Sequence, residues 1–281
     1  MTEISTNGDR PRMGQVKAVT SLTNPVVKAI RGLNQKKNRD ADNQFMAEGL
    51  KLVVDAVEAG WRLDTLVYAQ AQAGHERVQK LAAKCKSDGG LVLEVSDAVL
   101  IKITRRDNPQ SVIGVFQQAW TPLAQIAERP ATVWVALEGI KDPGNLGTVI
   151  RTADSVGATG VILIGQTCDP FSVEAVRATM GSVFNISLAR ATPADFVAWC
   201  RTWPGQVVGT HLEGSVDYRQ IAYQEPMVLF MGNEKSGLPD DLVSVCTDLA
   251  KIPMAGKADS LNLAIATGIM LYEMRRKHLT V

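Results

Sequence analysis

Polar side chains follow glycine- or proline-marked turns at three places in the second half of the chain. In the first, the turn Asp142–Asn145 precedes a helical pattern that carries Arg151. In the second, Glu234 stands in a glycine turn after the apolar run VLFM, and in the third, Asn262 lies in the first turn of an apolar helical pattern. Such turns let backbone amides approach a ligand closely, and a helix amino terminus offers free amides to a polar group.

Each of these residues also has an ordinary structural interpretation. Asp142 or Asn145 can cap the helix that follows, and Ser260 is placed to cap the last helix. Asn262 can be a buried amide with its hydrogen bonds satisfied, and a guanidinium at a strand end often pairs with an acid. Arg151 lies six residues beyond Asn145, where capping does not explain it. The residues alone leave two interpretations of Arg151, an ion pair with an acid, which is the more common role, or a part in the chemistry.

The glycine spacing disfavours the common nucleotide-binding loops. The chain contains no Gly-x-Gly, which the dinucleotide fingerprint requires. Gly232 and Gly237 have the frame of a phosphate loop, but Leu238 and Pro239 stand where Lys and Ser or Thr are needed. A kinase or ATPase is therefore a poor interpretation.

The elements that must position these turns form two successive α/β patterns. The second pattern has apolar strands alternating with helices, which predicts a mostly parallel sheet covered on both faces. We expect its strands at 132–139, 160–165, 184–189, 206–212, 226–232 and 249–254. We expect its helices at 146–156, 173–181 and 193–203, before a long final helix.

The first half has its own alternation of strands and helices. Its predicted strands are 45–49, 63–69, 91–95 and 112–118, with a leading helix from Asn24. We therefore expect a disordered tail (1–20), an α/β domain (21–118), a proline-containing linker (119–131) and a second α/β domain (132–281).

Composition limits the classes of function. With 46% apolar and 21% charged residues the chain is typical of a globular protein, and its net charge of +1 argues against a globally basic surface. Residues 1–45 nevertheless carry eight Lys or Arg against four Asp or Glu. Lys36, Lys37 and Arg39 belong to this stretch, which is either a solvated surface or a patch that contacts RNA phosphates.

Cysteine and histidine usage points away from metal chemistry. The four cysteines form no Cys-x-x-Cys pair and the chain has three histidines, so we predict reduced thiols and no metal site. We see no apolar run long enough to span a bilayer and no signal peptide. We expect a cytoplasmic protein without a membrane partner.

The three segments together resemble the three motifs of the SpoU (TrmH-like) branch of the SPOUT RNA ribose methyltransferases. The family pattern is Asn-x-Gly followed by Arg, then Gly-x-Glu-x-x-Gly-Leu, then Ile-Pro-Met followed by Ser-Leu-Asn. The matching positions are Asn145, Gly147 and Arg151; Gly232, Glu234, Gly237 and Leu238; and Ile252, Pro253, Met254, Ser260, Leu261 and Asn262. The stretch 176–184 resembles the family's Arg-Ala-Ser-x-Gly segment, with Thr179 in place of Ser, and the start of the first domain resembles a small substrate-binding domain.

The resemblance implies a second domain threaded into a trefoil knot that binds S-adenosylmethionine, and a homodimer that builds the active site across its interface. It implies a first domain similar to an RNA-binding ribosomal-protein fold. The apolar density of 261–271 exceeds what one helix face needs, so we expect the dimer to use the final helix and the helix after Asn145.

The implied reaction transfers a methyl group from S-adenosylmethionine to a ribose 2′-oxygen of RNA. Arg151 is then either an electrostatic clamp on the developing alkoxide, which we favour because a guanidinium stays protonated, or a general base. Asn145 and Glu234 hold that guanidinium or the ribose, while Ser260 and Asn262 position the substrate oxygen. The expected cofactor contacts are Gly232, Ile252 and Leu261, with Thr210, Phe230, Met231 and Met254 as further candidates; Arg177 is a candidate RNA contact.

Ribosomal RNA is the favoured substrate because the first domain resembles those of ribosomal-RNA-modifying members. Transfer RNA remains the alternative substrate. A non-catalytic knotted RNA-binding protein, or an α/β enzyme acting on small nucleotides, is the alternative class.

Overall fold

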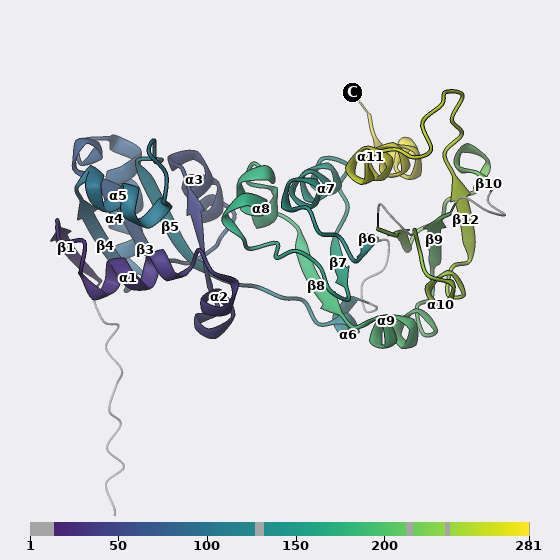
Figure 1. Ribbon diagram of the computed structural model, residues 1–281, viewed down its shortest axis with the longest axis horizontal. Coiled ribbons are helices and arrows are strands. Elements are labelled where there is room, and N and C mark those ends of the chain that lie inside the picture. Colours follow the sequence, from purple (N-terminus) through teal and green to yellow (C-terminus); the bar gives the residue numbers. More distant parts are fainter. Residues whose placement is uncertain (1–13, 127–131, 212–215, 234–236, 281) are drawn as a thin grey trace, which may run out of the picture. The chain divides into compact units, whose positions relative to one another are not determined.

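The computed structural model describes residues 14–126, 132–211, 216–233 and 237–280, and the chain divides into two compact units, 1–117 and 118–281 (Figure 1). Each unit is built on one sheet. The division falls directly after the last strand of the first unit.

The first unit contains a five-stranded sheet in the order β1-β4-β3-β5-β2. Its strands are β1 (Gln15–Val19), β2 (Gln44–Glu48), β3 (Leu63–Ala69), β4 (Leu91–Val95) and β5 (Val112–Gln117). β4 pairs in parallel with β1 and β3, whereas β5 runs antiparallel to β3 and β2. The helices are α1 (Pro25–Gly32), α2 (Lys36–Asp42), α3 (Leu50–Glu58), α4 (Glu76–Ser87) and α5 (Asp97–Thr104).

Two elements of this unit differ from the sequence prediction. β1 lies inside the predicted disordered tail, because Gln15–Val19 completes the edge of the sheet beside β4. Residues 1–13 lie outside the described part of the chain. The helix α2 was also missed, since its residues are charged and show no apolar face in the sequence.

The second unit contains a seven-stranded sheet in the order β10-β12-β9-β11-β6-β7-β8, and every pairing between these strands is parallel. Its strands are β6 (Val133–Glu138), β7 (Gly160–Ile164), β8 (Ser187–Ala191), β9 (Gln206–Thr210), β10 (Val216–Asp217), β11 (Met227–Met231) and β12 (Asp248–Lys251). The α/β class and the mostly parallel sheet are confirmed. β8 starts later than expected because Ser182–Phe184 form a 3-10 turn.

The helices of this unit lie on both sides of the sheet (Figure 1). They are α6 (Leu123–Ile126), α7 (Pro143–Ser155), α8 (Val173–Ala178), α9 (Pro193–Cys200), α10 (Asp240–Val243) and α11 (Leu263–Met274). α7 packs against both α8 and α11 and lies between them (Figure 1). α9 covers the opposite face of the sheet.

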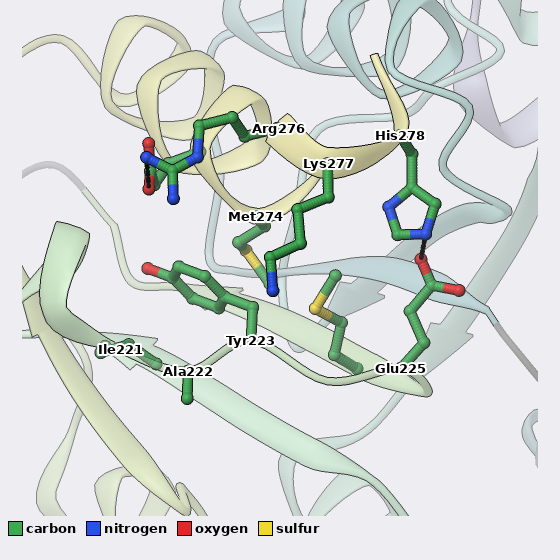
Figure 2. Close-up of a pocket in the computed structure, with 10 residues that line it drawn as sticks. Ile221, Ala222, Tyr223, Glu225, Met274, Arg276, Lys277 and His278 are labelled. Carbon is green, nitrogen blue, oxygen red and sulfur yellow. Dashed lines mark ion pairs between the residues drawn. The ribbon is translucent and has the colours of Figure 1, made fainter. Parts of the chain in front are cut away.

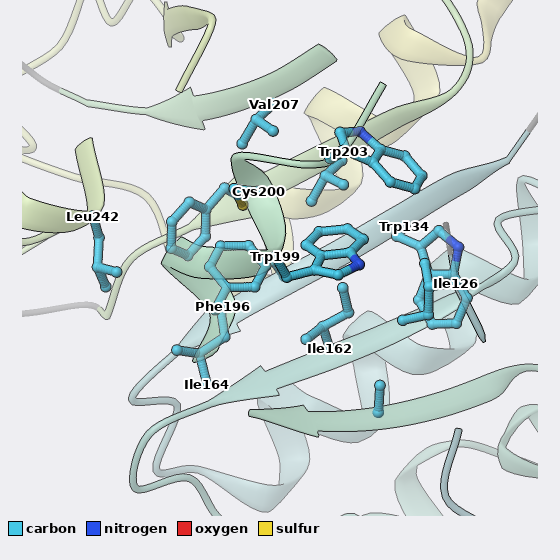
Figure 3. Packing of buried hydrophobic residues seen from close by; sticks show 14 of the residues in the cluster. Ile126, Trp134, Ile162, Ile164, Phe196, Trp199, Cys200, Trp203, Val207 and Leu242 are labelled. Atoms are coloured by element: carbon cyan, nitrogen blue, oxygen red, sulfur yellow. The ribbon is translucent and has the colours of Figure 1, made fainter. Parts of the chain in front are cut away.

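An aromatic core fixes α9 on the sheet (Figure 3). Phe196 of α9 meets Phe230 of β11 edge-on with ring centroids 4.9 Å apart, and the rings of Trp199 and Trp203 pack at a tilt of 34° with centroids 4.8 Å apart. Trp134 of β6 is fully buried in the same cluster. Because side chains alternate along a strand, the odd positions of β6 face the other layer, where α7 and α11 lie. Both faces are therefore buried, as the continuous apolar strands predicted.

The segment predicted as a linker packs on the second unit. Trp120 meets Phe171 edge-on at 5.2 Å, and the guanidinium of Arg190 lies over the Trp120 ring at 4.9 Å. The amide of Thr121 donates to the carbonyl of Leu188 at 2.7 Å. The described part of this segment is thus a structural edge of the second unit.

The cysteines are free thiols. Burial raises the pKa of Cys85 to about 11 and the pKa values of Cys200 and Cys246 to about 12, so these three stay protonated at neutral pH. Within the described residues, no cluster of three or more His, Cys, Asp or Glu is placed to hold a metal ion. No helix of the described segments is both long enough and apolar enough to cross a bilayer.

Candidate active site

The three polar turns meet because their strands are neighbours. β12, β9, β11 and β6 are adjacent and parallel, so their carboxyl ends lie at one edge of the sheet. From β6 the chain builds outward through β7 and β8, and it then returns to the other side of β6 through β9 and β11. An open parallel sheet binds ligands at such a reversal of strand order, outside the carboxyl ends.

A hydrogen bond joins the first and third turns. Nδ2 of Asn262 donates to Oδ1 of Asn145 at 3.1 Å, across 117 residues of sequence. Asn145 lies in the first turn of α7, and its backbone amide donates to Oδ1 of Asp142 at 2.6 Å. Asp142 is therefore the N-cap of α7, and the side chain of Asn145 faces the start of α11.

Asn262 also caps α11, which corrects the expectation for Ser260. Oδ1 of Asn262 accepts from the amides of Ala264 and Ile265 at 2.9 and 3.3 Å. Ser260 lies two residues before this cap and is exposed, so it does not begin the helix. The physical reason is that the amide oxygen of Asn262 already satisfies the first free N–H groups.

The second turn is tied to the end of β6. Nδ2 of Asn233 donates to Oε2 of Glu138 at 3.0 Å, and Asn233 forms an isolated bridge with Gly237. A Cβ at Gly232 would lie 2.2 Å from the carbonyl carbon of Gly237, so this close return of the backbone requires glycine. Glu234 lies outside the described residues, and its proposed role is not placed by the geometry.

Arg151 lies on the exposed surface of α7. None of the described acids lies within ion-pair distance of it, in contrast to Arg275, which pairs with Glu225 on the same unit. The ordinary explanation, a guanidinium held by an acid at the strand edge, therefore finds no partner among the described residues. Arg151 is free to meet an external anion.

The proposed cofactor residues surround the same edge. Phe230 and Met231 are buried in β11, and Oγ1 of Thr210 at the end of β9 donates to the sulfur of Met231 at 3.5 Å. Ile252 and Leu261 are half-buried, and Met254 is exposed. Thr210, Met231 and Ile252 thus lie at the ends of adjacent strands, while Phe230 contributes to the core beneath them.

The loop between β12 and α11 has free backbone donors. No N–H group of residues 252–261 donates to a backbone carbonyl of the described residues. Because an exposed loop with free amides beside half-buried Ile252 and Leu261 offers both polar and apolar contacts, it fits the adenine ring that the sequence resemblance implies. The residues present therefore suit S-adenosylmethionine.

The candidate RNA contacts differ in their exposure to solvent. Lys36 and Lys37 are exposed at the start of α2, and Arg177 is exposed in the last turn of α8. Arg39 is only 3% exposed, and its Nη1 donates to the carbonyl of Leu33 at 2.7 Å. The prediction for Arg39 is wrong, because this guanidinium caps the carboxyl end of α1.

A cavity of about 120 Å³ lies at the opposite edge of the sheet, beside Met227 at the start of β11 (Figure 2). Ile221, Tyr223, Glu225 and residues of the segment 273–278 line it. None of the residues proposed from the sequence does so. The three motifs therefore mark a different place from this cavity.

The link between Asn233 and Glu138 was not expected from the sequence. Glu138 ends β6 and Asn233 follows β11. Both are polar residues at strand ends, the same pattern that predicted the other site residues. Their pairing could be found only by knowing that β6 and β11 are neighbours.

Substitutions at Asn262 separate its two roles, the cap of α11 and the bond to Asn145. Asn262→Ala is expected to lower the free energy of unfolding by about 1 kcal/mol, since the acceptor for both amides at the helix start is removed. Asn262→Asp keeps the capping oxygen and loses only the donor to Asn145, so it should be less destabilising. Chemical denaturation of the two variants checks this order, and equal destabilisation would contradict the capping role.

The polar turns lie where the strand order of a parallel sheet reverses, which is where α/β proteins of this topology bind their ligands. A model of the SpoU rRNA Methylase family matches residues 132–272, and a model of the MRM3-like substrate binding domain matches residues 24–114. The chain belongs to the SpoU rRNA methylase family, as its three motifs indicated.

Similar proteins cover both units. The crystal structure of an AdoMet-bound rRNA methyltransferase from Sinorhizobium meliloti is 59% identical, with a TM-score of 0.88 over 94% of this chain and 99% of that chain. The 23S rRNA (guanosine(2553)-2′-O)-methyltransferase RlmP of Bacillus subtilis is 30% identical, covering 92% of this chain and 100% of that protein. The 23S rRNA (uridine(2479)-2′-O)-methyltransferase of Streptomyces viridochromogenes is 28% identical over 88% of each chain.

Proposed function

We propose that this protein transfers a methyl group from S-adenosylmethionine to a ribose 2′-hydroxyl of ribosomal RNA. The observation that carries the proposal is the hydrogen bond between Asn145 and Asn262, which joins two family motifs at the start of α7, the helix that also carries the exposed guanidinium of Arg151. The named relatives act on the 2′-oxygen of 23S rRNA, and the Sinorhizobium protein is an AdoMet-bound rRNA methyltransferase. Transfer RNA is the alternative substrate.

The residues of this chain have distinct roles in the proposed reaction. S-adenosylmethionine supplies the methyl group when bound. Arg151 stabilises negative charge on the 2′-oxygen or on a neighbouring phosphate, and its permanent positive charge makes a clamp a better assignment than a base. Asn145 and Asn262 orient the ribose from their shared hydrogen bond, with Ser260 and Glu234 as further candidates. Alignment of the oxygen with the methyl group supplies much of the rate.

The cofactor is proposed to lie along the loop 252–261. Gly232 lets the turn after β11 fold tightly, while Ile252 and Leu261 offer apolar surface to the adenine. Thr210, Met231 and Met254 border this place, and Phe230 supports it from the core. The trefoil knot belongs to the same proposal, because the family's pocket is formed by knotted loops.

The first unit is proposed to bind RNA. Its match to a substrate binding domain model and its mixed sheet support this, and a ribosomal-protein-like fold stays part of the proposal. A cytoplasmic location is likewise proposed, from the free thiols and from the RNA substrate.

A methyl-transfer assay tests the function. The purified chain, tritiated S-adenosylmethionine and ribosomal RNA from cells lacking the gene are expected to yield label in a ribose 2′-O-methyl nucleotide. Transfer RNA from the same cells is the matched control. Label in transfer RNA alone would show that transfer RNA, and not ribosomal RNA, is the substrate. Cofactor binding without any methyl transfer would favour the non-catalytic alternative.

A homodimer through α11 and α7 is proposed from exposed apolar side chains. Ile265 and Tyr272 are 56% and 52% exposed on α11, although they share a helix with a buried core face. They are seven residues apart, two turns along one side of the helix. An apolar stripe on α11 beside α7 fits a second copy of this chain.

Charge on this stripe is expected to separate the subunits. Ile265→Arg should give a monomer at micromolar concentration, because an unpaired charge would be buried in the interface. Analytical ultracentrifugation measures the mass. Val216→Arg, at another exposed apolar site of the same unit, is the control. A wild-type chain that is monomeric and fully active would exclude the dimer.

Lys36 and Lys37 are proposed to contact RNA phosphates. Their joint replacement by Ala should weaken RNA binding and flatten its salt dependence, by about 0.7–0.9 in slope for each phosphate that is no longer neutralised. Lys80 and Lys84 on α4 are exposed but pair with Glu76 and Asp88, so their double replacement is the control. Filter binding at several salt concentrations measures the slope; an unchanged slope identifies a solvated surface.

A further inference from the structure

Met180 has an unusual backbone conformation in the turn after α8. Its φ angle is +54°, in the left-handed region, and its side chain is 54% exposed. Bulky residues rarely adopt this conformation, because the Cβ approaches the backbone. The backbone of Met180 is thus strained, although its apolar side chain gains little burial. Such strain often marks a functional position.

The turn holds Met180 rigidly. Thr179 is fully buried, and its Oγ1 donates to the carbonyl of Val176 at 2.7 Å and accepts from the amide of Gly181 at 3.3 Å. The amide of Met180 donates to the carbonyl of Arg177 at 3.1 Å. Backbone and side-chain bonds therefore fix the turn on both sides of Met180 and leave its thioether facing outward.

The segment that contains Met180 packs along the side of α7 that carries Arg151. Gly147, Arg151 and Asp154 are spaced by four and three residues, so they share one side of the helix. At one end a Cβ on Gly147 would lie 2.3 Å from the Cβ of Ala178, and at the other end Nδ2 of Asn185 donates to Oδ2 of Asp154 at 3.1 Å. Residues 178–185 thus span the length of α7 that contains Arg151.

The charges beside Met180 favour a nucleic acid. Arg151 and Arg177 are exposed and form no ion pair with the described residues, while the neighbouring carboxylate of Asp154 is bonded to Asn185. Guanidinium groups contact phosphate or ribose, whereas an apolar side chain can contact a base. Unstacked RNA bases stack on aromatic side chains or on arginine, and a methionine sulfur also makes favourable contacts with aromatic rings.

We propose that Met180 packs against the base of the nucleotide whose ribose is methylated. The inference rests on the proposed function and names a specificity-determining residue for it. Arg151 serves the ribose oxygen, and Met180, in the segment 178–185 that packs along the same side of α7, receives the attached base. The strained backbone is retained because it presents the side chain to the substrate.

Two substitutions at one position test this. Met180→Gly removes the side chain and relieves the strain, so it is expected to raise the melting temperature while lowering kcat/KM for ribosomal RNA about tenfold, mainly through KM. Met180→Leu keeps an apolar side chain and is expected to retain most activity. Asn43→Gly, at another left-handed position in the first unit, is the control that relieves strain without changing methyl transfer.

The readouts distinguish the possible failures. Ribosomal RNA with tritiated S-adenosylmethionine is the probe, and cofactor affinity and particle mass are measured for each variant. A Met180→Gly protein with wild-type kcat/KM overturns the inference alone. So does one with weakened cofactor binding or a smaller mass, since Met180 would then support the pocket or the subunit contact. A wild-type chain that methylates no RNA overturns the inference together with the proposed function.

Discussion

Replacing Arg151 with alanine is expected to lower methyl transfer by roughly 10²–10³-fold, the loss typical of one group that stabilises developing negative charge. The effect should appear in kcat, because Arg151 acts on charge that grows in the transition state. Cofactor affinity should stay at the wild-type level, since Arg151 is on the exposed surface of α7 and the proposed cofactor loop is 252–261. Single-turnover kinetics with ribosomal RNA measures the step.

This substitution should leave the free energy of unfolding unchanged. Arg151 is exposed and forms no ion pair with the described residues, so its removal leaves no buried partner behind. Arg201→Ala, at an exposed position after α9, is the matched control. Near-normal turnover of Arg151→Ala on ribosomal RNA would reject the clamp and leave the fold and the family unaffected.

Replacing Leu261 with arginine is expected to abolish binding of S-adenosylmethionine. Leu261 is half-buried at the end of the loop 252–261, and a long charged side chain there would occupy the apolar surface proposed for the adenine. Because Leu261 precedes the cap of α11, the helix itself should form normally. Isothermal titration calorimetry with S-adenosylmethionine measures the loss, which should exceed about a hundredfold if the pocket is filled.

RNA binding distinguishes this loss from unfolding. Leu261→Arg should bind RNA with wild-type affinity and retain the wild-type melting temperature without cofactor. Met254→Arg, on the exposed part of the same loop, should weaken the cofactor less. Wild-type cofactor affinity in Leu261→Arg would show that the adenine does not bind at this loop.

The sequence alone determined the class of the protein and the places where its chemistry lies. Apolar strands alternating with helices predicted a parallel sheet, because a strand buried on both faces has little room for polar residues. The polar residues Asp142, Asn145 and Asn262, in turns or at the start of an apolar helix, indicated either helix caps or ligand contacts. Glycine was required where the backbone returns on itself, as at Gly232. These are local properties that a pattern of residues can carry.

Which residues meet was decided by the tertiary structure. The order of strands placed β6 beside β11, so Asn233 reaches Glu138. The packing of α11 against α7 brings Asn262 to Asn145 across 117 residues of sequence. Arg39 looked like a surface charge, yet the turn between α1 and α2 gives its guanidinium a buried carbonyl. Gln15–Val19 looked unstructured because an edge strand gains its order only from its neighbour, β4. Hydrogen bonds to distant partners leave no periodic trace in a sequence, and only the folded chain reveals them.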